Sequence, residues 1–499
     1  MRKSAVALLG AVSVFACAAS AAPANLAPII LPKPAAPGPA VQPYVNVPAG
    51  LVALTHVRLI DGTGGPVQED RTIVIDGGKI VSVGPASDAP PKDAKVLDLS
   101  GDTVLPGLVG MHDHLYYIGR PDLNAAAASD PPVLAPQMTF SAPRLYLANG
   151  VTTMRTTGSV EPYADINLKH LIDAGTLPGP HMDVTGPYLE GAGSYFVQMH
   201  QLRDAADARK TVAFWADQGA TSFKAYMMIT RAELKAAVEE AHRHGLKITG
   251  HLCAVTYPEA IAAGIDDLEH GFFVNTQLDP GKKPDECPKT TGLPTMVAMT
   301  PDSPAATALI KDLVAHHVAV TSTLPVFEDL GRGLKRLRPA ELAAMSPQAR
   351  EAYLYERDAI AKRSAASAKD WATAYQNDVG MEHRFVAAGG LLLAGPDPTG
   401  DGGVVPGFGD LREVELLVKG GFTPEEAVKI ATLNGATYLG LQKRIGSVAA
   451  GKDADLFVVK GDPSKTIDDI EKVETVFKDG VGYDSAALLE SVNGRYGQY

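Results

Sequence analysis

The sequence predicts an α/β fold: a (β/α)₈ TIM barrel with a small composite β-sandwich domain formed from both chain ends. Between residues 102 and 439, short apolar runs that end in polar residues alternate with alanine-rich amphipathic stretches, as repeated strand and helix units do. On either side, residues 51–101 and 440–485 contain β-branched runs separated by glycine-rich turns. We therefore expect the two β segments to pair beside the barrel.

The composition excludes several classes of protein. The 499-residue chain is 45% hydrophobic and 20% charged, which is typical of globular proteins with a large core. Its net charge of −12 argues against a nucleic-acid-binding surface. Three cysteines are too few for a disulfide scaffold or a thiolate zinc module, whereas thirteen histidines leave imidazole available as a metal ligand.

The first residues have the features of a secretory signal peptide, for which we expect the bounds 1–21. Two basic residues precede an apolar run over 5–16, and the small residues 19–21 resemble a cleavage site. The sequence therefore predicts a periplasmic or secreted protein without a transmembrane segment. Lipid attachment at Cys17 is the alternative, disfavoured by the bulky residue two positions before it.

A proline-rich linker, residues 22–50, precedes the first β segment. Proline fixes φ and lacks a backbone donor, so this stretch is expected to be semi-extended, either lying on the body or acting as a spacer. Within 51–101, Asp76-Gly77 lies between two β-branched runs and predicts a β-hairpin.

The barrel region, 102–439, contains eight expected strands. Their ranges are 103–114, 151–156, 181–186, 221–226, 247–252, 267–270, 318–324 and 391–395. Helices are expected at 205–218, 231–244 and 257–263, and another begins at Thr423-Pro424. Residues 326–385 are charged and alanine-rich, which indicates a helical excursion, and residues 486–499 are expected to form a C-terminal tail.

Potential metal ligands follow several of these strands. His112 and His114 are two residues apart, so in an extended segment both side chains point to the same side and can bind one metal ion. His251, His270 and Asp397 also stand at strand ends, where the active sites of barrels form.

Lys224 lies within an apolar expected strand, where a buried ammonium group is costly. Desolvation lowers the pKa of a lysine, and the resulting neutral amine can capture carbon dioxide as a carbamate, an anionic oxygen ligand. Tyr226, two residues further on, points to the same side of an extended segment.

Taken together, these segments resemble the amidohydrolase superfamily, in its branch of prolidase-like and imidazolonepropionase-like metal-dependent hydrolases. The matching motifs are Pro106-Gly107-Leu108 with His112 and His114, Asn149-Gly150-Val151-Thr152-Thr153, Gly219-Ala220 with Lys224, Gly250-His251, Leu268-Glu269-His270-Gly271, Gly395-Pro396-Asp397, Gly421-Phe422-Thr423-Pro424, and Gly446-Ser447-Val448 with Gly451-Lys452-Asp453-Ala454-Asp455-Leu456. They occur in the family's order over about residues 51–480.

The resemblance implies a site with two metal ions, by default Zn²⁺. His112, His114 and Asp397 would bind one ion, His251 and His270 the other, and carboxylated Lys224 would bridge them. A metal-activated water would attack the substrate, with Asp397 as general acid and base. Tyr226 would stabilise the oxyanion or hold a substrate group.

The resulting interpretation is a metal-dependent amidohydrolase acting on carbon–nitrogen (non-ester) bonds of a small-molecule or peptide substrate, such as a dipeptide or an N-acyl amino acid. The alternatives are a cyclic-amide or ester hydrolase on the same site, or a non-catalytic barrel scaffold. Relatives of this type often form homo-oligomers. The loop 189–196 lacks the Gly-Gly-His sequence of several relatives, so substrate contacts there are not transferable.

Five further residues are interpreted in structural terms. Glu269, Arg155 and His200 are expected to support the fold rather than to contact substrate. An oxidising compartment permits a disulfide between Cys253 and Cys287, but we expect these thiols to remain unbridged.

Overall fold

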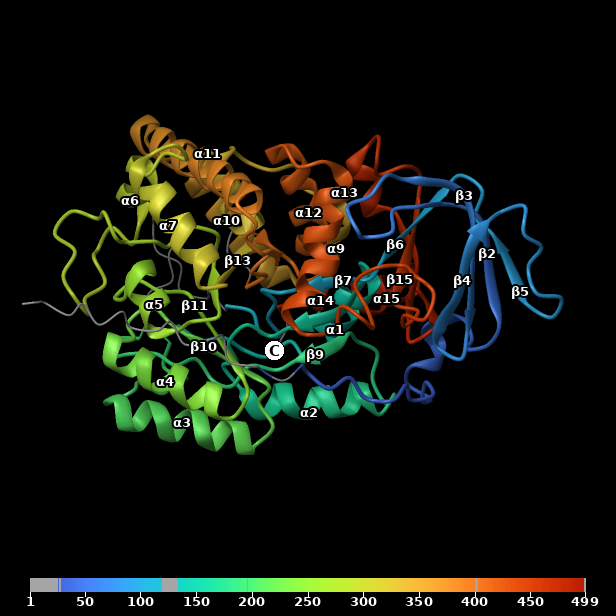
Figure 1. Ribbon diagram of the computed structural model, residues 1–499, viewed down its shortest axis with the longest axis horizontal. Helices are drawn as coiled ribbons and strands as arrows, with labels where there is room; N and C mark the ends of the chain where they lie inside the picture. Colours follow the sequence, from blue (N-terminus) through green and yellow to red (C-terminus); the bar gives the residue numbers. More distant parts are fainter. Residues whose placement is uncertain (1–25, 27, 119–132, 195, 400–402, 498–499) are drawn as a thin grey trace, which may run out of the picture.

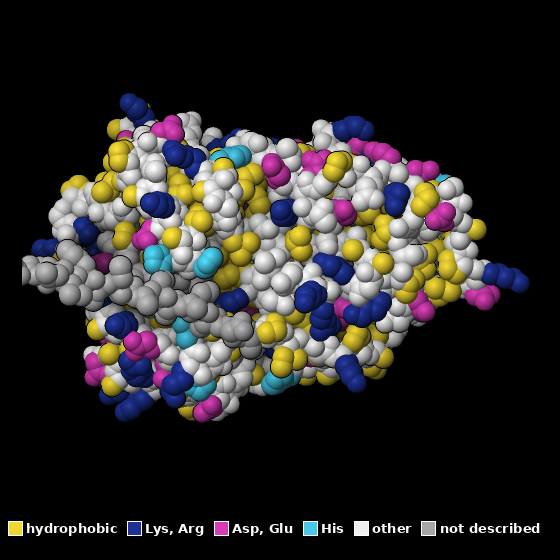
Figure 2. All heavy atoms as spheres, in the orientation of Figure 1, with side chains coloured by type: hydrophobic (Ala, Val, Ile, Leu, Met, Phe, Trp, Pro, Cys, Tyr) yellow, Lys and Arg dark blue, Asp and Glu magenta, His cyan; other side chains and the backbone are white. Residues whose placement is uncertain are grey.

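The computed structural model describes residue 26 and residues 28–118, 133–194, 196–399 and 403–497 (Figure 1). The expected signal peptide, including Cys17, lies outside the described residues. Within the described ranges, no helix is both long enough and apolar enough to span a membrane. Acidic and basic side chains are interspersed over the face that Figure 2 shows.

A nine-stranded sheet forms one end of the molecule and contains strands from both ends of the chain. Its strands are β1 (Val45–Val47), β2 (Val52–Leu59), β3 (Gln68–Asp76), β4 (Lys79–Pro85), β5 (Lys95–Asp98), β6 (Asp102–Pro106), β15 (Leu456–Lys460), β16 (Val473–Lys478) and β17 (Val481–Asp484). The path runs β1-β17-β16-β15-β6-β2-β3-β4, with β5 paired to β2. Strands β6 and β15 join the two chain segments by antiparallel pairing; a two-layered sandwich stays a prediction.

The hairpin predicted at Asp76-Gly77 is confirmed. Asp76 pairs with Lys79 across a two-residue turn, in which Gly77 and Gly78 have φ values of 56° and 78°. Two consecutive positive φ values characterise a type I′ turn, which matches the twist of the flanking strands and favours glycine.

Eight shorter strands form two parallel sheets. The first contains β7 (Leu108–Gly110), β8 (Val151–Arg155) and β9 (His181–Asp183); the second contains β10 (Ser222–Ala225), β11 (Lys247–Gly250), β12 (Asp267–Glu269), β13 (Ala319–Ser322) and β14 (Leu392–Ala394). Each lies inside one of the eight predicted ranges. The Met111 N–H donates to Ala394 O (2.9 Å) and the Gly186 N–H to Ser222 O (2.9 Å), so hydrogen bonds connect both edges of the three-stranded sheet to the five-stranded one. Closure into a barrel stays a prediction.

The prediction of one strand over 103–114 is wrong. The segment divides at Gly107 into β6, in the nine-stranded sheet, and β7, in the three-stranded parallel sheet. The Gly107 N–H donates to Asp455 O (2.9 Å), and a side chain at this position would collide with Thr152. The chain therefore changes sheets here, and the two histidines follow β7 instead of lying within it.

Helices flank the parallel strands on opposite sides, with α3 and α4 on one side and α7 and α11 on the other (Figure 1). The α-helices are α1 (Ser141–Ala148), α2 (Pro162–Asp173), α3 (Ala205–Asp217), α4 (Arg231–Arg243), α5 (Tyr257–Ala263), α6 (Leu293–Ala298), α7 (Pro304–Ala315), α8 (Leu324–Gly331), α9 (Pro339–Ala344), α10 (Pro347–Ala361), α11 (Ala365–Ala387), α12 (Phe408–Gly420), α13 (Pro424–Lys429), α14 (Gly435–Tyr438) and α15 (Ser485–Ser491). Shorter helical segments are η1 (Gln42–Tyr44), η3 (Ile430–Asn434) and η4 (Ile467–Glu471).

The predicted helices are confirmed, and α8 to α11 form the predicted helical excursion. Thr230 begins α4 with a capping box to Glu233, and Thr423 does the same for α13 with Glu426. In each case the hydroxyl and the carboxylate satisfy backbone N–H groups that the first helical turn leaves without partners.

The described part of the proline-rich linker lies on the body of the protein. The Ile29 N–H donates to Leu439 O (3.2 Å) and the Gly38 N–H to Gly175 O (2.8 Å). Leu31 is buried in a cluster with Tyr438. Of the two possibilities left open by the sequence, the structure therefore favours a packed leader.

Cys253 and Cys287 form a disulfide, so the expectation of unbridged thiols is wrong. The loop that carries Cys287 folds back over the end of β11, where the Lys282 ammonium donates to Ala254 O (2.7 Å). Asp279 stabilises the same loop by accepting hydrogen bonds from the backbone N–H groups of Gly292 and Thr295. The bridge anchors this loop two residues beyond His251, and it depends on tertiary contacts that the sequence spacing does not reveal.

Candidate metal centre

The structure brings together the six residues predicted as metal ligands. They follow or end strands of the two parallel sheets, with His112 and His114 after β7, Lys224 in β10, His251 after β11, His270 after β12 and Asp397 after β14. The carboxyl ends of parallel strands lie on one side of their sheet, so this placement concentrates the polar side chains.

One group consists of His112, His114 and Asp397, whose potential ligand atoms lie within 4.8 Å of one another. Asp397 Oδ1 is 3.1 Å from His114 Nε2 and 3.6 Å from His112 Nε2. Burial by itself raises the pKa of Asp397, but His112, His114 and Lys224 lower it well below its usual range. The carboxylate is therefore ionised and faces two imidazole nitrogens.

The second group consists of His251 and His270. His251 Nδ1 is 2.9 Å from His270 Nε2, and His270 Nδ1 is 2.9 Å from Thr323 Oγ1. Burial lowers the pKa of His270 and lowers that of His251 to about 3, so both rings are neutral. The ring centroids of His112 and His270 are 4.6 Å apart, which places this pair beside the first group.

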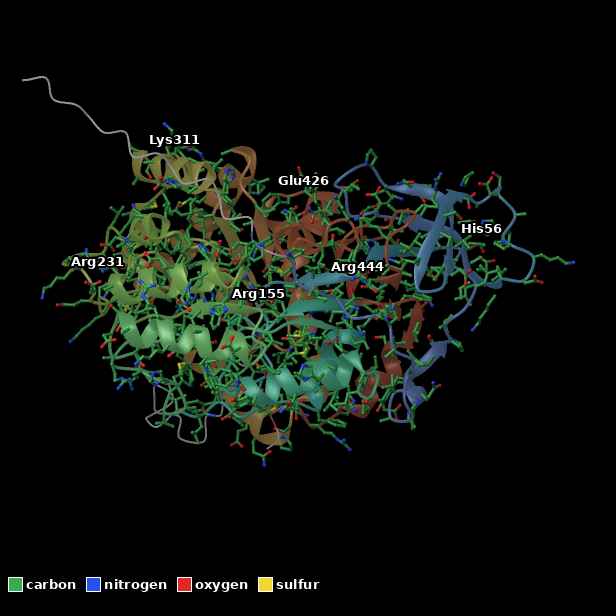
Figure 3. All side chains as sticks on the ribbon, turned by 60° about the horizontal axis from the view of Figure 1, so that its bottom comes forward. His56, Arg155, Arg231, Lys311, Glu426 and Arg444 are labelled. Atoms are coloured by element: carbon green, nitrogen blue, oxygen red, sulfur yellow. A yellow bond between two sulfur atoms is a disulfide. The ribbon has the colours of Figure 1, made fainter. Side chains whose placement is uncertain are left out.

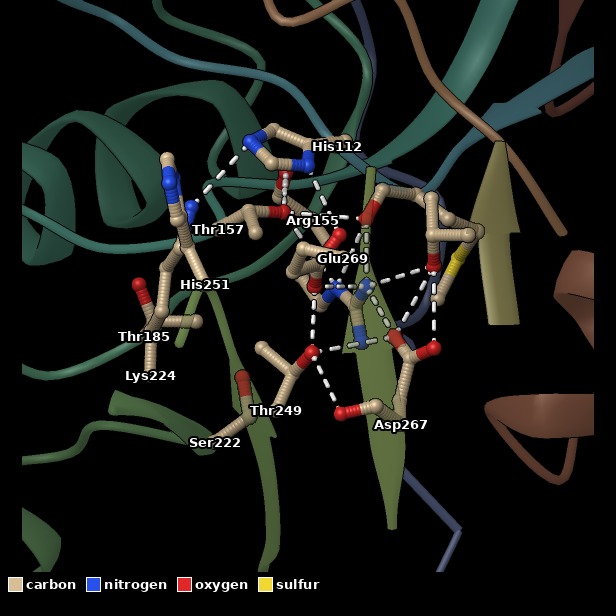
Figure 4. Close-up of polar contacts among 12 residues, drawn as sticks. His112, Arg155, Thr157, Thr185, Ser222, Lys224, Thr249, His251, Asp267 and Glu269 are labelled. Atoms are coloured by element: carbon tan, nitrogen blue, oxygen red, sulfur yellow. Dashed lines mark hydrogen bonds and ion pairs between the residues drawn. The ribbon is translucent and has the colours of Figure 1, made fainter. Parts of the chain in front are cut away.

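Lys224 lies between these groups. Its Nζ is 3.1 Å from His112 Nε2 (Figure 4). The same atom is 5.4 Å from the ring centroid of Tyr188. Burial lowers the pKa of Lys224 to about 8, since the desolvated ammonium is disfavoured. A pKa of about 8 leaves roughly a tenth of the amine neutral at pH 7 and about half at pH 8, far more than for an exposed lysine.

The backbone at two proposed ligands adopts a conformation that is rare for residues with side chains. Asp397 and His270 have φ values of 53° and 68°. Such left-handed geometry costs roughly 1–3 kcal/mol per residue and persists where surrounding structure imposes it, often at functional sites. At Asp397 the N–H donates to His112 O (3.0 Å), which connects the two ligand-bearing loops.

A buried network of charged side chains contacts the Nδ1 side of the His112 ring. Arg155 Nη2 donates to Asp267 Oδ2 (2.7 Å) and Glu269 Oε1 (2.8 Å), while Glu269 Oε2 lies 2.7 Å from His112 Nδ1 (Figure 4). Glu269 thus holds Nδ1 and leaves His112 Nε2 facing the site, as carboxylates commonly do for ligating histidines. Arg155 lies in the interior, whereas Arg231 lies at the periphery (Figure 3).

The contacts of Arg155 and Glu269 are more specific than the general structural role that the sequence predicted for them. Arg155 and Glu269 were expected to be structural, and their contacts form a chain from the strand interior to His112. Asp267, which was not singled out, completes it. The available signal was the spacing of Asp267 and Glu269, which places both carboxylates on one face of β12.

Three tyrosines line one side of the site. The ring of Tyr226 is 5.1 Å from that of His251 and 4.7 Å from that of Tyr188, measured between centroids. Tyr188 Oη is 2.5 Å from Tyr116 Oη. Tyr226 therefore lies where the sequence placed it, while Tyr116 and Tyr188 were missed because they belong to loops without a recognisable motif.

Two other histidines, His200 and His181, contact carboxylates outside the site. His200 Nε2 lies 3.1 Å from Asp207 Oδ2. His181, at the opposite end of β9, lies 3.2 Å from Asp479 Oδ2 and near Asp455. Burial lowers the pKa of His181, and Lys478 Nζ, 3.6 Å from Asp479 Oδ2, already supplies a cation there. We therefore interpret this second cluster as a buried Lys478–Asp479 ion pair, which the neutral His181 ring connects to β9.

Comparison with known proteins gives a consistent assignment. The sequence model of the Amidohydrolase family matches residues 103–329 and 399–482, more than half of the chain. A dihydroorotase from Pelotomaculum thermopropionicum is 24% identical over 431 residues, which cover 82% of this chain and 89% of the relative. An imidazolonepropionase from Streptomyces griseus is 40% identical over 89 residues, which span 16% of this chain and 23% of that relative.

The fold is also shared with solved structures. A Xaa-Pro dipeptidase with bound methionine in its active site is similar with a TM-score of 0.63 and 21% identity, over 87% of this chain and 100% of the other. At this identity the likeness concerns the α/β fold alone.

Proposed function

Because the chain belongs to the amidohydrolase family, we propose that it is a metal-dependent hydrolase that cleaves the amide C–N bond of a dipeptide or an N-acyl amino acid. The observation that supports this proposal is the convergence of four histidines, Asp397 and Lys224 at the ends of the parallel strands. The name of the similar Xaa-Pro dipeptidase supports the choice of a dipeptide.

The donor set fits divalent cations. His112, His114 and Asp397 would hold one ion, and His251 and His270 the other. Imidazoles that are neutral and a carboxylate that is ionised are the protonation states in which these side chains bind Zn²⁺. When bound, a pair of such ions supplies a water of lowered pKa and polarises the scissile carbonyl.

Asp397 provides the proton transfers. Its carboxylate is ionised before reaction, so it can accept a proton from the attacking water and later donate that proton to the leaving amine. The hydrogen bond from its backbone N–H to His112 O would hold the backbone that carries this carboxylate. Tyr226, beside His251, would donate its hydroxyl proton to the developing oxyanion or to a substrate group.

Lys224 would serve as a bridging ligand after carboxylation. Its neutral Nζ adds to the carbon of carbon dioxide, forms an N–C bond and loses one proton, which leaves a carbamate anion. The 3.1 Å separation of its Nζ from His112 Nε2 supports this role, because the new oxygens would form close to the first group of ligands. Glu269 and Arg155 do not take part directly and keep His112 oriented.

Metal removal tests the proposal. Dialysis of the purified protein against a chelator is expected to abolish hydrolysis of dipeptides and N-acyl amino acids, and Zn²⁺ is expected to restore it. Metal analysis should give two ions per chain. A protein that binds no divalent ion would contradict the proposal. If the protein cleaves only cyclic amides or esters in a metal-dependent way, the proposed substrate is wrong but the metal-dependent hydrolase stands.

The carbamate is tested during the same reloading. Apoprotein reloaded in ¹³C-labelled bicarbonate should show a carbamate carbon by NMR, and a Lys224→Arg variant treated in the same way should not. A wild-type enzyme that is active without this signal would exclude carboxylation.

We further propose export to the periplasm or beyond, with cleavage after residue 21. The proposal rests on the N-terminal sequence and is supported by the Cys253–Cys287 disulfide, since such bonds persist in oxidising compartments. The mass of the mature protein tests the cleavage site.

We also propose that the eight parallel strands close into a barrel beside a composite β-sandwich, which an experimental structure would test.

A further inference from the structure

The last described residues of the chain lie against the loops that carry proposed metal ligands. After α15, residues 492–497 form a segment that we call the C-terminal strap. Its Gly494 N–H donates to Ala343 O (2.7 Å) and its Tyr496 N–H to Ala344 O (2.9 Å), at the end of α9. The Ser346 N–H donates to Tyr496 O (2.7 Å), so backbone hydrogen bonds hold the strap from both directions.

The side chain of Tyr496 points inward from the strap and is 1% exposed. Its hydroxyl donates to Pro398 O (3.1 Å), the carbonyl of the residue that follows Asp397. Proline has no N–H, so this carbonyl is the only group through which Pro398 can form a conventional hydrogen bond.

The ring of Tyr496 contacts the other ligand-bearing loop. It packs against Tyr117, three residues beyond His114, with centroids 5.4 Å apart and the rings at 76°. Edge-to-face packing of two aromatic rings stabilises their contact beyond the effect of the buried apolar area alone. The Ile118 N–H donates to Thr399 O (3.0 Å), so the two loops also bind each other directly.

The Asp397 loop needs such support. Asp397 has a φ of 53°, a conformation that a non-glycine residue adopts only when its surroundings favour it. Without the tyrosine hydroxyl, the buried Pro398 carbonyl would lose this hydrogen bond, and the loop could relax away from the geometry that places Asp397 Oδ1 3.1 Å from His114 Nε2.

We propose that Tyr496 is a positioning residue, which fixes the Asp397 loop against the His112–His114 loop so that metal retention depends on the last residues of the chain. This proposal rests on the proposed metal site. It assigns a role to a tail that carries no motif and lies outside the residues matched by the family.

The test compares Tyr496→Phe with Tyr163→Phe in the full chain. Both changes remove one tyrosine hydroxyl, but Tyr163 is exposed and donates to Gln218 on the surface. The readouts are the Kd for Zn²⁺, measured by competition with a chelator, and the Tm of the apoprotein. We expect Tyr496→Phe to weaken Zn²⁺ binding by about tenfold, the size of effect expected when a buried carbonyl loses its partner, together with a small decrease in the apoprotein Tm. Tyr163→Phe should change neither.

Each outcome has a defined meaning. A Kd for Tyr496→Phe within twofold of wild type overturns the proposal, and so does a lower apoprotein Tm with unchanged Zn²⁺ affinity, because a purely structural role predicts that result. Removal of residues 493–499 should weaken Zn²⁺ binding more than Tyr496→Phe does. If this truncated chain does not fold, the Zn²⁺ affinity of Tyr496→Phe still tests the proposal. A wild-type protein that binds no Zn²⁺ would contradict the proposed function itself, whereas wild-type binding with an unaffected variant would contradict only the role of Tyr496.

Discussion

Asp397→Asn is expected to lower kcat/KM by about a thousandfold, while the protein remains folded. The substitution preserves the shape of the side chain but removes the charge and the basic oxygen that accept a proton from water. It also weakens a contact to His114, now 3.1 Å from Oδ1. Steady-state kinetics with the best dipeptide or N-acyl amino acid substrate, together with metal analysis of the same sample, measures both effects.

The metal analysis separates two explanations for the loss. If Asp397→Asn retains both ions and is still inactive, proton transfer is the missing function; if one ion is lost, ligation contributes as well. Asp312→Asn is the matched control because this carboxylate, on α7, is 41% exposed and pairs with His316 just beyond the end of that helix. A less than tenfold decrease for Asp397→Asn would show that Asp397 is not the general acid and base.

Tyr226→Phe is expected to lower activity less than Asp397→Asn does. Loss of one donor to an oxyanion commonly costs about 10²–10³ in kcat, so the variant should fall between wild type and Asp397→Asn. Because the ring that packs on His251 is retained, Zn²⁺ affinity should not change. Unchanged kcat and KM would exclude a catalytic or binding role for Tyr226.

The site could be predicted largely because its residues are local features of strands. Five of the proposed ligands stand at or just beyond the ends of short apolar runs: His112, His114, Lys224, His251 and His270. The periodicity of the sequence alone locates those ends to within a few residues. Parallel strands then place the residues on one side of the sheet without any knowledge of long-range contacts.

Several of the features that were missed depend on partners far away in the sequence. Gly107 interrupts an apolar run because Asp455 and Thr152 meet it there, so no local pattern marks the break between β6 and β7. The disulfide requires the loop of Cys287 to fold over β11. Likewise, nothing near Tyr496 in the sequence indicates that its hydroxyl reaches the Asp397 loop.

Arg155→Met is expected to lower the free energy of unfolding by about 3–5 kcal/mol. Arg155 is 1% exposed and binds Asp267 and Glu269, both fully buried, so its removal leaves two carboxylates without their cation. Methionine fills much of the same volume, which limits the loss of packing. Denaturation in urea with linear extrapolation measures the change. The matched control is Arg231→Met: Arg231 is 46% exposed and pairs with Asp285 at 2.9 Å, and exposed pairs contribute about 0–1 kcal/mol.

The pH dependence of this loss identifies its cause. Burial raises the pKa of Asp267 to about 7 even with Arg155 present, and removing the cation should raise it further. Between the unfolded pKa of about 3.9 and the raised folded value, the folded state binds more protons than the unfolded state, so stability falls as pH rises. The deficit of Arg155→Met relative to wild type should therefore be larger at pH 8 than at pH 5. An equal deficit at both pH values would indicate lost packing instead of an uncompensated buried charge.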